Sequence, residues 1–268
     1  MHGMEVDCYK KLFQTIGNIL DLIEKDDMPK YLLFLENAFP YMDNYNHHKG
    51  MNGIIQELTG LLKTKNIGTD SDRALLLDFQ ATLETKPEKA IKLEKDALAQ
   101  IETITADNAR LVSNLHANLG GLYRMNGYPD LAREHMEKSI SLLDQFNLLH
   151  INDSIPQIAN YAMFLTEQQE PERGISELQK LSGIIKEYHS DECLDYAKVQ
   201  ETLATIYLMT ANLSQAKTHF KKAFKIYEKI WADEPEMIEA KYREIQELYP
   251  QIGFSIGKTL SGLLTKQT

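Results

Sequence analysis

The chain has 268 residues, of which 43% are hydrophobic and 25% charged, a composition typical of globular proteins that argues against extended disorder. Its 39 acidic and 29 basic residues give a formal net charge of −10, which disfavours nucleic acid and anionic membranes as partners, although one local basic face is compatible with that total. Two cysteines, Cys8 and Cys193, are too few for a disulfide framework, and no apolar run reaches the roughly 20 residues of a membrane span, so we expect a cytoplasmic protein.

The first 68 residues are predicted to form three helices, over 5–24, 29–42 and 49–64. Apolar residues recur at helical spacing in the first of them, as Leu12, Ile16 and Ile19 show. The segment lacks small residues at the positions where the following units have them. We therefore interpret residues 1–68 as a degenerate repeat or a cap.

Residues 69–232 repeat with a period of 42 residues. A step of 42 relates Gly120 to Ala162 and Ala204, Tyr123 to Leu165 and Tyr207, Ala132 to Gly174 and Ala216, and Met136 to Leu178 and Phe220. Two antiparallel helices can approach closely only where side chains are small, and the large residues fill the space beside them. Such a hairpin cannot bury its apolar face alone, so neighbouring hairpins stack. The first unit departs from the pattern, because Asp78 stands where a small residue is expected.

Four helix pairs are predicted within this repeat. They cover 71–84 with 86–104, 109–125 with 129–146, 154–168 with 171–188, and 194–210 with 213–232. Pro87, Pro129 and Pro171 lie at or near the first turn of second helices, where a missing N–H costs little. Residues 233–268 are predicted to cap the array with two helices, over 236–249 and 253–264.

The pattern is clearest in three segments, NLGGLYRMNGYPDLA (Asn118–Ala132), NYAMFLTEQQEPERG (Asn160–Gly174) and TLATIYLMTANLSQA (Thr202–Ala216). These segments resemble the tetratricopeptide repeat family, and the 42-residue period is most similar to the repeats of kinesin light chains. The resemblance covers about residues 69–232. It implies an all-α, right-handed α-α superhelix in which the N-terminal helices, the four repeats and the C-terminal cap form one continuous solenoid.

The first helices of such a superhelix line its concave groove, and the residue just before the packed pair points into it. Asn118 and Asn160 hold that position in successive units. In kinesin light chains an Asn at the matching place binds the backbone of an extended peptide, which suits an amide that is both donor and acceptor. The alternative is that both residues bond to an adjacent helix. The candidate peptide-binding residues are Asn114, Asn118, Gly121, Arg124, Asn160, Met163, Lys198 and Glu201.

No catalytic or metal-binding constellation stands out in the sequence. A Gly-rich phosphate loop, a His-Glu-x-x-His motif and a Cys-x-x-Cys motif are all missing, and we interpret His189 and Cys193 as parts of a solvated turn. We expect no cofactor, and the leading interpretation is a non-enzymatic scaffold or adaptor that binds an extended peptide or a partner helix. The alternatives are a regulatory sensor of a signalling peptide and an enzyme with an unrecognised site. The partner's identity and the oligomeric state stay open.

Overall fold

The computed structural model describes residues 48–65 and 68–248, together with Lys30, Leu32, Leu35 and Pro250. Within residues 48–65 and 68–248 the chain forms ten α-helices and no β-strand. The predicted helices over 5–24 and 253–264 lie outside the described residues. Of the helix predicted over 29–42, only Lys30, Leu32 and Leu35 are described, and all three are helical.

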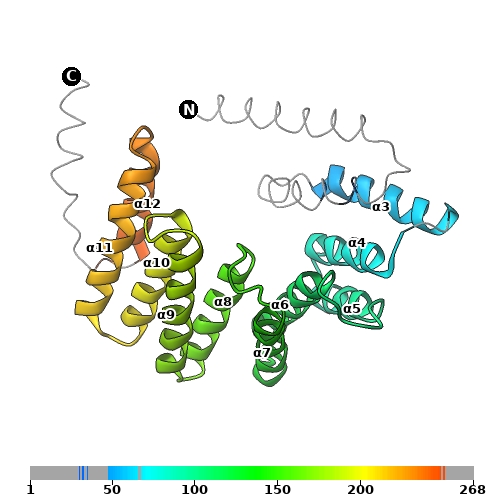
Figure 1. Cartoon of the computed structure of the whole chain (residues 1–268), viewed down its shortest axis with the longest axis horizontal. Coiled ribbons are helices and arrows are strands. Elements are labelled where there is room, and N and C mark those ends of the chain that lie inside the picture. The colour runs from blue at the N-terminus through cyan, green and yellow to red at the C-terminus, as the bar shows by residue number, and fades with distance from the viewer. Residues whose placement is uncertain are drawn as a thin grey trace. The chain divides into compact units, whose positions relative to one another are not determined.

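The helices agree with the sequence predictions to within two residues at every described end except one. They are α3 (His48–Lys65), α4 (Asp70–Leu83), α5 (Pro87–Leu98), α6 (Ala109–Met125), α7 (Pro129–Gln145), α8 (Ser154–Glu167), α9 (Pro171–Tyr188), α10 (Leu194–Met209), α11 (Leu213–Ile230) and α12 (Pro235–Leu248), labelled in Figure 1. Four of them begin at a proline, whose fixed φ suits the first helical position.

The exception is the end of α5, which was predicted at residue 104 and lies at Leu98. Four of the five residues at 101–105 are β-branched, and such residues are weaker helix formers. The side chain of Asn108 fixes the loop instead, because it accepts a hydrogen bond from the Thr105 N–H at 2.8 Å and donates one to the Thr103 carbonyl at 2.9 Å. The prediction of a longer helix was therefore wrong.

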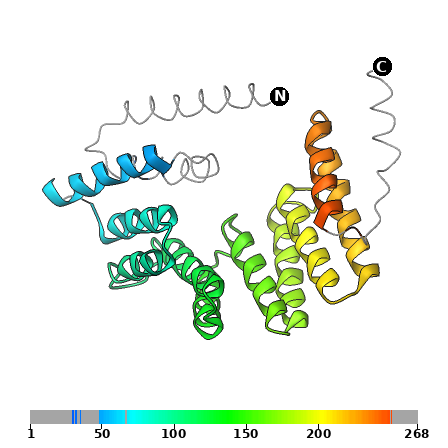
Figure 2. The ribbon, with the colours of Figure 1, turned by 180° about the vertical axis from the view of Figure 1, so that it is seen from behind.

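Two compact units make up the chain, Met1–Leu142 and Leu143–Thr268. In the first, α4 packs against α3, α5 and α6. In the second, α8, α9, α10 and α11 pack successively as neighbours, and Figures 1 and 2 show these helices side by side from both directions. The predicted division into 1–68, 69–232 and 233–268 stays a prediction.

The helix pairs meet at the small residues that define the repeat. Ala132, Ala162 and Ala204 are completely buried. A Cβ atom added to Gly174 would lie 2.6 Å from the Ala162 carbonyl oxygen, and one added to Gly120 would lie 2.6 Å from the Met136 Cγ atom. The backbone of Ala162 leaves no room for a side chain at Gly174, in agreement with the predicted meeting of these two positions.

The core of the second unit extends from the helix pair α10–α11 onto α12. Ile238, Tyr242 and Ile245 are buried and recur at helical spacing along α12. The Tyr242 ring stacks on Phe224 of α11, with the ring centroids 4.1 Å apart. This packing places α12 beside the pocket described next.

Candidate functional site

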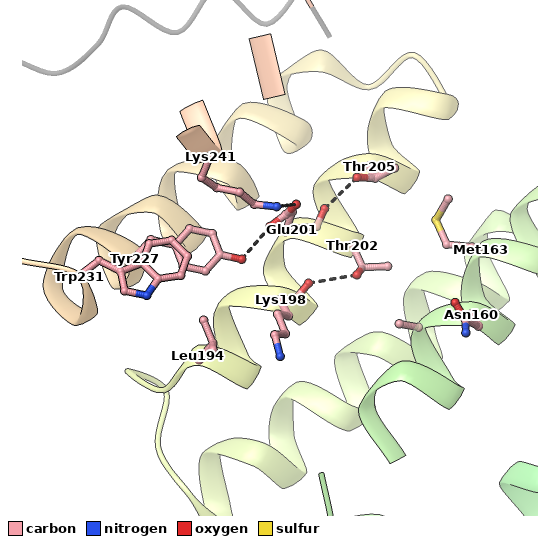
Figure 3. A pocket seen from close by; sticks show the side chains of 11 residues that line it. Asn160, Met163, Leu194, Lys198, Glu201, Thr202, Thr205, Tyr227, Trp231 and Lys241 are labelled. Carbon is pink, nitrogen blue, oxygen red and sulfur yellow. Dashed lines mark hydrogen bonds and ion pairs between the residues drawn. The ribbon is translucent and has the colours of Figure 1, made fainter. Parts of the chain in front are cut away.

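A pocket of about 470 Å³ opens on the second unit between α8, α10, α11 and α12 (Figure 3). Four of the eight predicted site residues, Asn160, Met163, Lys198 and Glu201, contribute to its wall. The other lining residues are Ala159, Leu194, Thr202, Thr205, Tyr227, Trp231 and Lys241. Its volume is in the usual range for a ligand-binding pocket.

Helical periodicity explains why these side chains converge. On α10, the lining residues stand at positions 194, 198, 201, 202 and 205, which is one face of a helix. The opposite face carries Val199 and Leu203, which are buried in the core. Asn160 and Met163 lie about one turn apart on α8 and line the pocket from that helix.

The carboxylate of Glu201 is the centre of a hydrogen-bond network on this wall. Its Oε2 accepts a hydrogen bond from the Tyr227 hydroxyl at 2.7 Å, and its Oε1 lies 2.7 Å from the Lys241 Nζ. Lys241 also bonds to Glu244, at 3.1 Å. The network ties α10 to α11 and α12, so Glu201 serves first to hold the wall together.

Burial and the neighbouring negative charges have opposite effects on the pKa of Lys241. Burial disfavours its ammonium, but the hydrogen bonds and negative charges of Glu201 and Glu244 outweigh that effect and raise the pKa of Lys241. Burial, followed by the neighbouring Glu201 carboxylate, also raises the pKa of the Tyr227 hydroxyl. At neutral pH Tyr227 therefore stays a neutral donor, and Lys241 stays charged.

Three groups on the wall remain available to a ligand. The side-chain amide of Asn160 is exposed and makes no hydrogen bond to any residue that the structure describes. The Lys198 ammonium is exposed, and its contact with Asp195 is long, at 3.5 Å. Trp231 stacks on Tyr227, with centroids 4.8 Å apart and planes at 10°. An amide, a cation and an aromatic surface thus border one space.

The remaining predicted residues, Asn114, Asn118, Gly121 and Arg124, lie on α6 in the first unit. Gly121 borders open space, because a Cβ added there would meet no atom within 4 Å. Asn118 is exposed, yet its Nδ2 donates a hydrogen bond to Asp78 Oδ1 of α4 at 2.8 Å. Asn118 thus makes the bond to a neighbouring helix that the sequence left open as an alternative, whereas Asn160 does not.

Asp78 belongs to an acid pair at the α4–α5 contact. It holds the position of Gly120 one unit earlier, and Glu94 holds that of Met136. Glu94 is 1% exposed, and its Oε2 has no hydrogen-bond partner. Burial, followed by the charge of Asp78, raises the pKa of Glu94 well above its usual range. Glu94 is therefore protonated at neutral pH, in a place that the next unit fills with an apolar side chain.

Seven lining residues were not among the predicted site residues. Ala159, Thr202 and Thr205 lie beside predicted residues on α8 and α10, whereas Leu194, Tyr227, Trp231 and Lys241 were missed altogether. Large residues of second helices were interpreted as core filling, and Tyr227 is indeed buried. One signal was present: Trp231 is the single tryptophan of the chain and follows Tyr227 by one helical turn. The contribution of Lys241 depends on the packing of α12 and has no sequence signal of its own.

Metal ligands do not gather among the described residues, in that no three His, Cys, Asp or Glu side chains are placed to share an ion. The His189 Nε2 lies 2.8 Å from the His150 carbonyl oxygen, and the Cys193 Sγ accepts a hydrogen bond from the Tyr196 N–H as the N-cap of α10. None of the described helices is long and apolar enough to cross a membrane.

In comparison with protein families, residues 154–229 match the model of the tetratricopeptide repeat. Residues 154–229 are tetratricopeptide repeats. The matched segment runs from the start of α8 nearly to the end of α11. All pocket-lining residues except Trp231 and Lys241 lie within these tetratricopeptide repeats. No curated protein matches the sequence.

Solved structures share the fold at low sequence identity. A putative kinesin light chain with nearly identical tetratricopeptide-like repeats, from Podospora anserina, is 15% identical, with a TM-score of 0.57 over 73% of this chain and 93% of that chain. A variant of it gives 0.59, also at 15% identity, over 74% and 94%. BtubC (BKLC) from P. vanneervenii is 16% identical, with a TM-score of 0.51 over 76% and 74%. These likenesses confirm the predicted fold class, an all-α tetratricopeptide-like solenoid.

Proposed function

We propose that this chain is a protein-interaction scaffold whose second unit binds an extended peptide segment of a partner protein in the pocket beside α10. Tetratricopeptide repeats are commonly scaffolds of this kind, and no catalytic role is part of the proposal. The observation that carries it is the Asn160 amide, which is exposed at the pocket wall without a hydrogen bond to a described residue. We also propose a cytoplasmic location, from the composition of the chain alone.

Each group on the wall has a role in this proposal. The Asn160 amide offers a donor and an acceptor to one peptide unit of the ligand, so its grip does not depend on the ligand's sequence. Met163 and Trp231 offer apolar surface to a side chain. Lys198, exposed on α10, is placed to meet a carboxylate. Glu201 orients Tyr227 and Lys241 rather than contacting the peptide first.

The proposal is tested by selecting binders from a displayed library of random peptides and measuring their affinity by fluorescence anisotropy. Asn160→Ala removes one or two hydrogen bonds, so the dissociation constant should rise roughly 3- to 100-fold. The melting temperature should stay at the wild-type value, because the Asn160 side chain bonds to no described residue. Selected peptides that bind the variant as tightly as the wild type would remove Asn160 from the site.

Asn118→Ala is the matched comparison, because Asn118 holds the equivalent position 42 residues earlier. It loses the hydrogen bond to Asp78, so we expect a loss of roughly 0.5–1 kcal/mol in the free energy of unfolding. Affinity for peptides bound at the second unit should not change. Thermal and urea unfolding measure the first effect, and anisotropy the second. A loss of affinity at unchanged stability would show that Asn118 also contacts the peptide.

A further inference from the structure

Helix α11 carries a row of lysines that the proposed function does not use. Lys217, Lys221 and Lys225 follow one another at intervals of four residues, Lys222 lies beside them, and all four are exposed. We call these four residues the lysine ridge. None of them forms an ion pair with a residue that the structure describes, whereas Lys229, the next in the row, pairs with Glu192. The ridge is therefore an uncompensated positive surface on a chain with a net charge of −10.

The repeat architecture does not require this row. The residues 42 positions before Lys217, Lys221 and Lys225 are Ile175, Gln179 and Gly183 on α9, and those 84 positions before are Arg133, Glu137 and Ser141 on α7. On α9 these three residues are uncharged. On α7, Arg133 and Glu137 carry opposite charges and form an i,i+4 ion pair. Like charges four residues apart repel and destabilise a helix. Lys222 recurs as Lys180 and Lys138. The row formed by Lys217, Lys221 and Lys225 is present in one repeat only, and its cost indicates a role outside folding.

The lysine ridge is separate from the pocket. Successive residues of an α-helix are about 100° apart, so Tyr227 lies on the opposite side of α11 from Lys225. Tyr227 and Trp231 face the pocket, and the apolar stripe of α11, with Phe220 and Phe224, is buried in the core. A ligand of the ridge would leave the pocket open.

We propose that the lysine ridge is an interaction surface for an acidic polypeptide segment. Its lysines step along the helix by about 6 Å, and carboxylates at alternate positions of an extended chain are about 6.6–6.8 Å apart. Lysine ammonium groups bind carboxylates as point charges. The surface is suited to flexible, salt-dependent binding of Asp- and Glu-rich chain.

Two other polyanions fit this surface less well. Single-stranded nucleic acid is gripped by aromatic stacking as well as by charge, but α11 has no arginine, and its aromatic residues Phe220, Phe224 and Tyr227 are buried. An anionic membrane binds helices that can insert an apolar face, and the apolar face of α11 is occupied by the core.

The test uses the full chain and a fluorescein-labelled peptide of alternating Glu and Ser, with a Gln-for-Glu peptide as its neutral control. Binding is followed by fluorescence anisotropy at low ionic strength and at about 0.15 M salt. We expect the acidic peptide to bind and the neutral one not to bind. Lys221→Gln with Lys225→Gln should weaken binding by about 3- to 30-fold and leave peptides selected for the pocket unaffected.

Lys89→Gln with Lys92→Gln is the control variant, because it removes the same charge from exposed positions on α5. It should leave binding of the acidic peptide within about twofold of the wild type. An equal loss of affinity for the acidic peptide in both variants would mean that only the net charge of the protein matters, and the proposal would fail. It would also fail if an oligonucleotide or phosphatidylserine vesicles bound the ridge more tightly than the acidic peptide. The two proposals are tested independently, because a failure to select peptides for the pocket would not change the result of the acidic-peptide experiment.

Discussion

Gly174→Ala is expected to lower the free energy of unfolding by about 1–3 kcal/mol, although alanine is the better helix former. The new Cβ would lie 2.6 Å from the Ala162 carbonyl oxygen and 3.3 Å from the Ala162 Cα. Both atoms belong to the backbone of α8, so no side-chain rotation relieves the overlap. The helices α8 and α9 must separate, and the contacts beside the glycine, including buried Leu165 and Leu178, loosen with them.

The matched control lies on the same helix. Gly183 is exposed on α9, and a Cβ added there meets no atom within 4 Å. Gly183→Ala should therefore stabilise the protein by up to about 1 kcal/mol through helix propensity alone. Urea unfolding of the two variants measures effects of opposite sign from the same substitution. Equal midpoints for Gly174→Ala and the wild type would show that the two helices do not meet at Gly174.

Glu94→Gln is expected to stabilise the protein at neutral pH, by on the order of 1–3 kcal/mol. In the folded chain Glu94 is buried beside Asp78 and held protonated. In the unfolded chain its carboxyl group ionises in water, near the ordinary value of 4.5. Folding at neutral pH therefore has to return a proton to this group. Glutamine is neutral in both states and can still donate to the Asp78 carboxylate, so the free-energy cost of protonating residue 94 on folding disappears.

The sign of the pH dependence follows from the raised pKa. Above about pH 4.5 the unfolded state binds fewer protons at Glu94 than the folded state does, so the stability of the wild type falls as the pH rises from there. The advantage of Glu94→Gln should therefore be small near pH 4.5 and grow towards pH 8.

Urea midpoints measured across this range for the wild type and the variant test that trend. Asp96→Asn, on the exposed face of the same helix, is the control and should change stability by less than about 0.5 kcal/mol at all pH values. A wild type that is more stable than Glu94→Gln at pH 8 would mean that Glu94 is ionised and needed in that form. Glu94→Leu copies Leu178 at the equivalent position. This variant loses both the ionisable group and the hydrogen-bonding capacity, whereas Glu94→Gln loses only the ionisable group, so the comparison separates the two effects on stability.

The sequence was sufficient for the helices and their pairing, because both depend on local chemistry. Prolines at first helical positions and turn residues such as Gly127, whose φ of 76° is left-handed, fix where helices begin and end. The bounds of α6 and α9 agree with the prediction to the residue. Small residues repeated every 42 positions fix which helix faces meet, since any side chain at Gly174 would overlap a backbone. The prediction for α5 failed where a loop contact from Asn108 replaced the helix.

The sequence predicted only those site residues that share a face of one helix. Lys198 and Glu201 follow from the periodicity of α10, but Trp231 and Lys241 reach the pocket only because α11 and α12 pack beside that helix. Asn118 and Asn160 are equivalent in sequence and differ in the structure, because Asp78 stands within hydrogen-bond distance of the first, and the second has no such neighbour among the described residues. Which polar groups are satisfied inside the protein depends on side chains from distant segments, and only the tertiary structure brings these together.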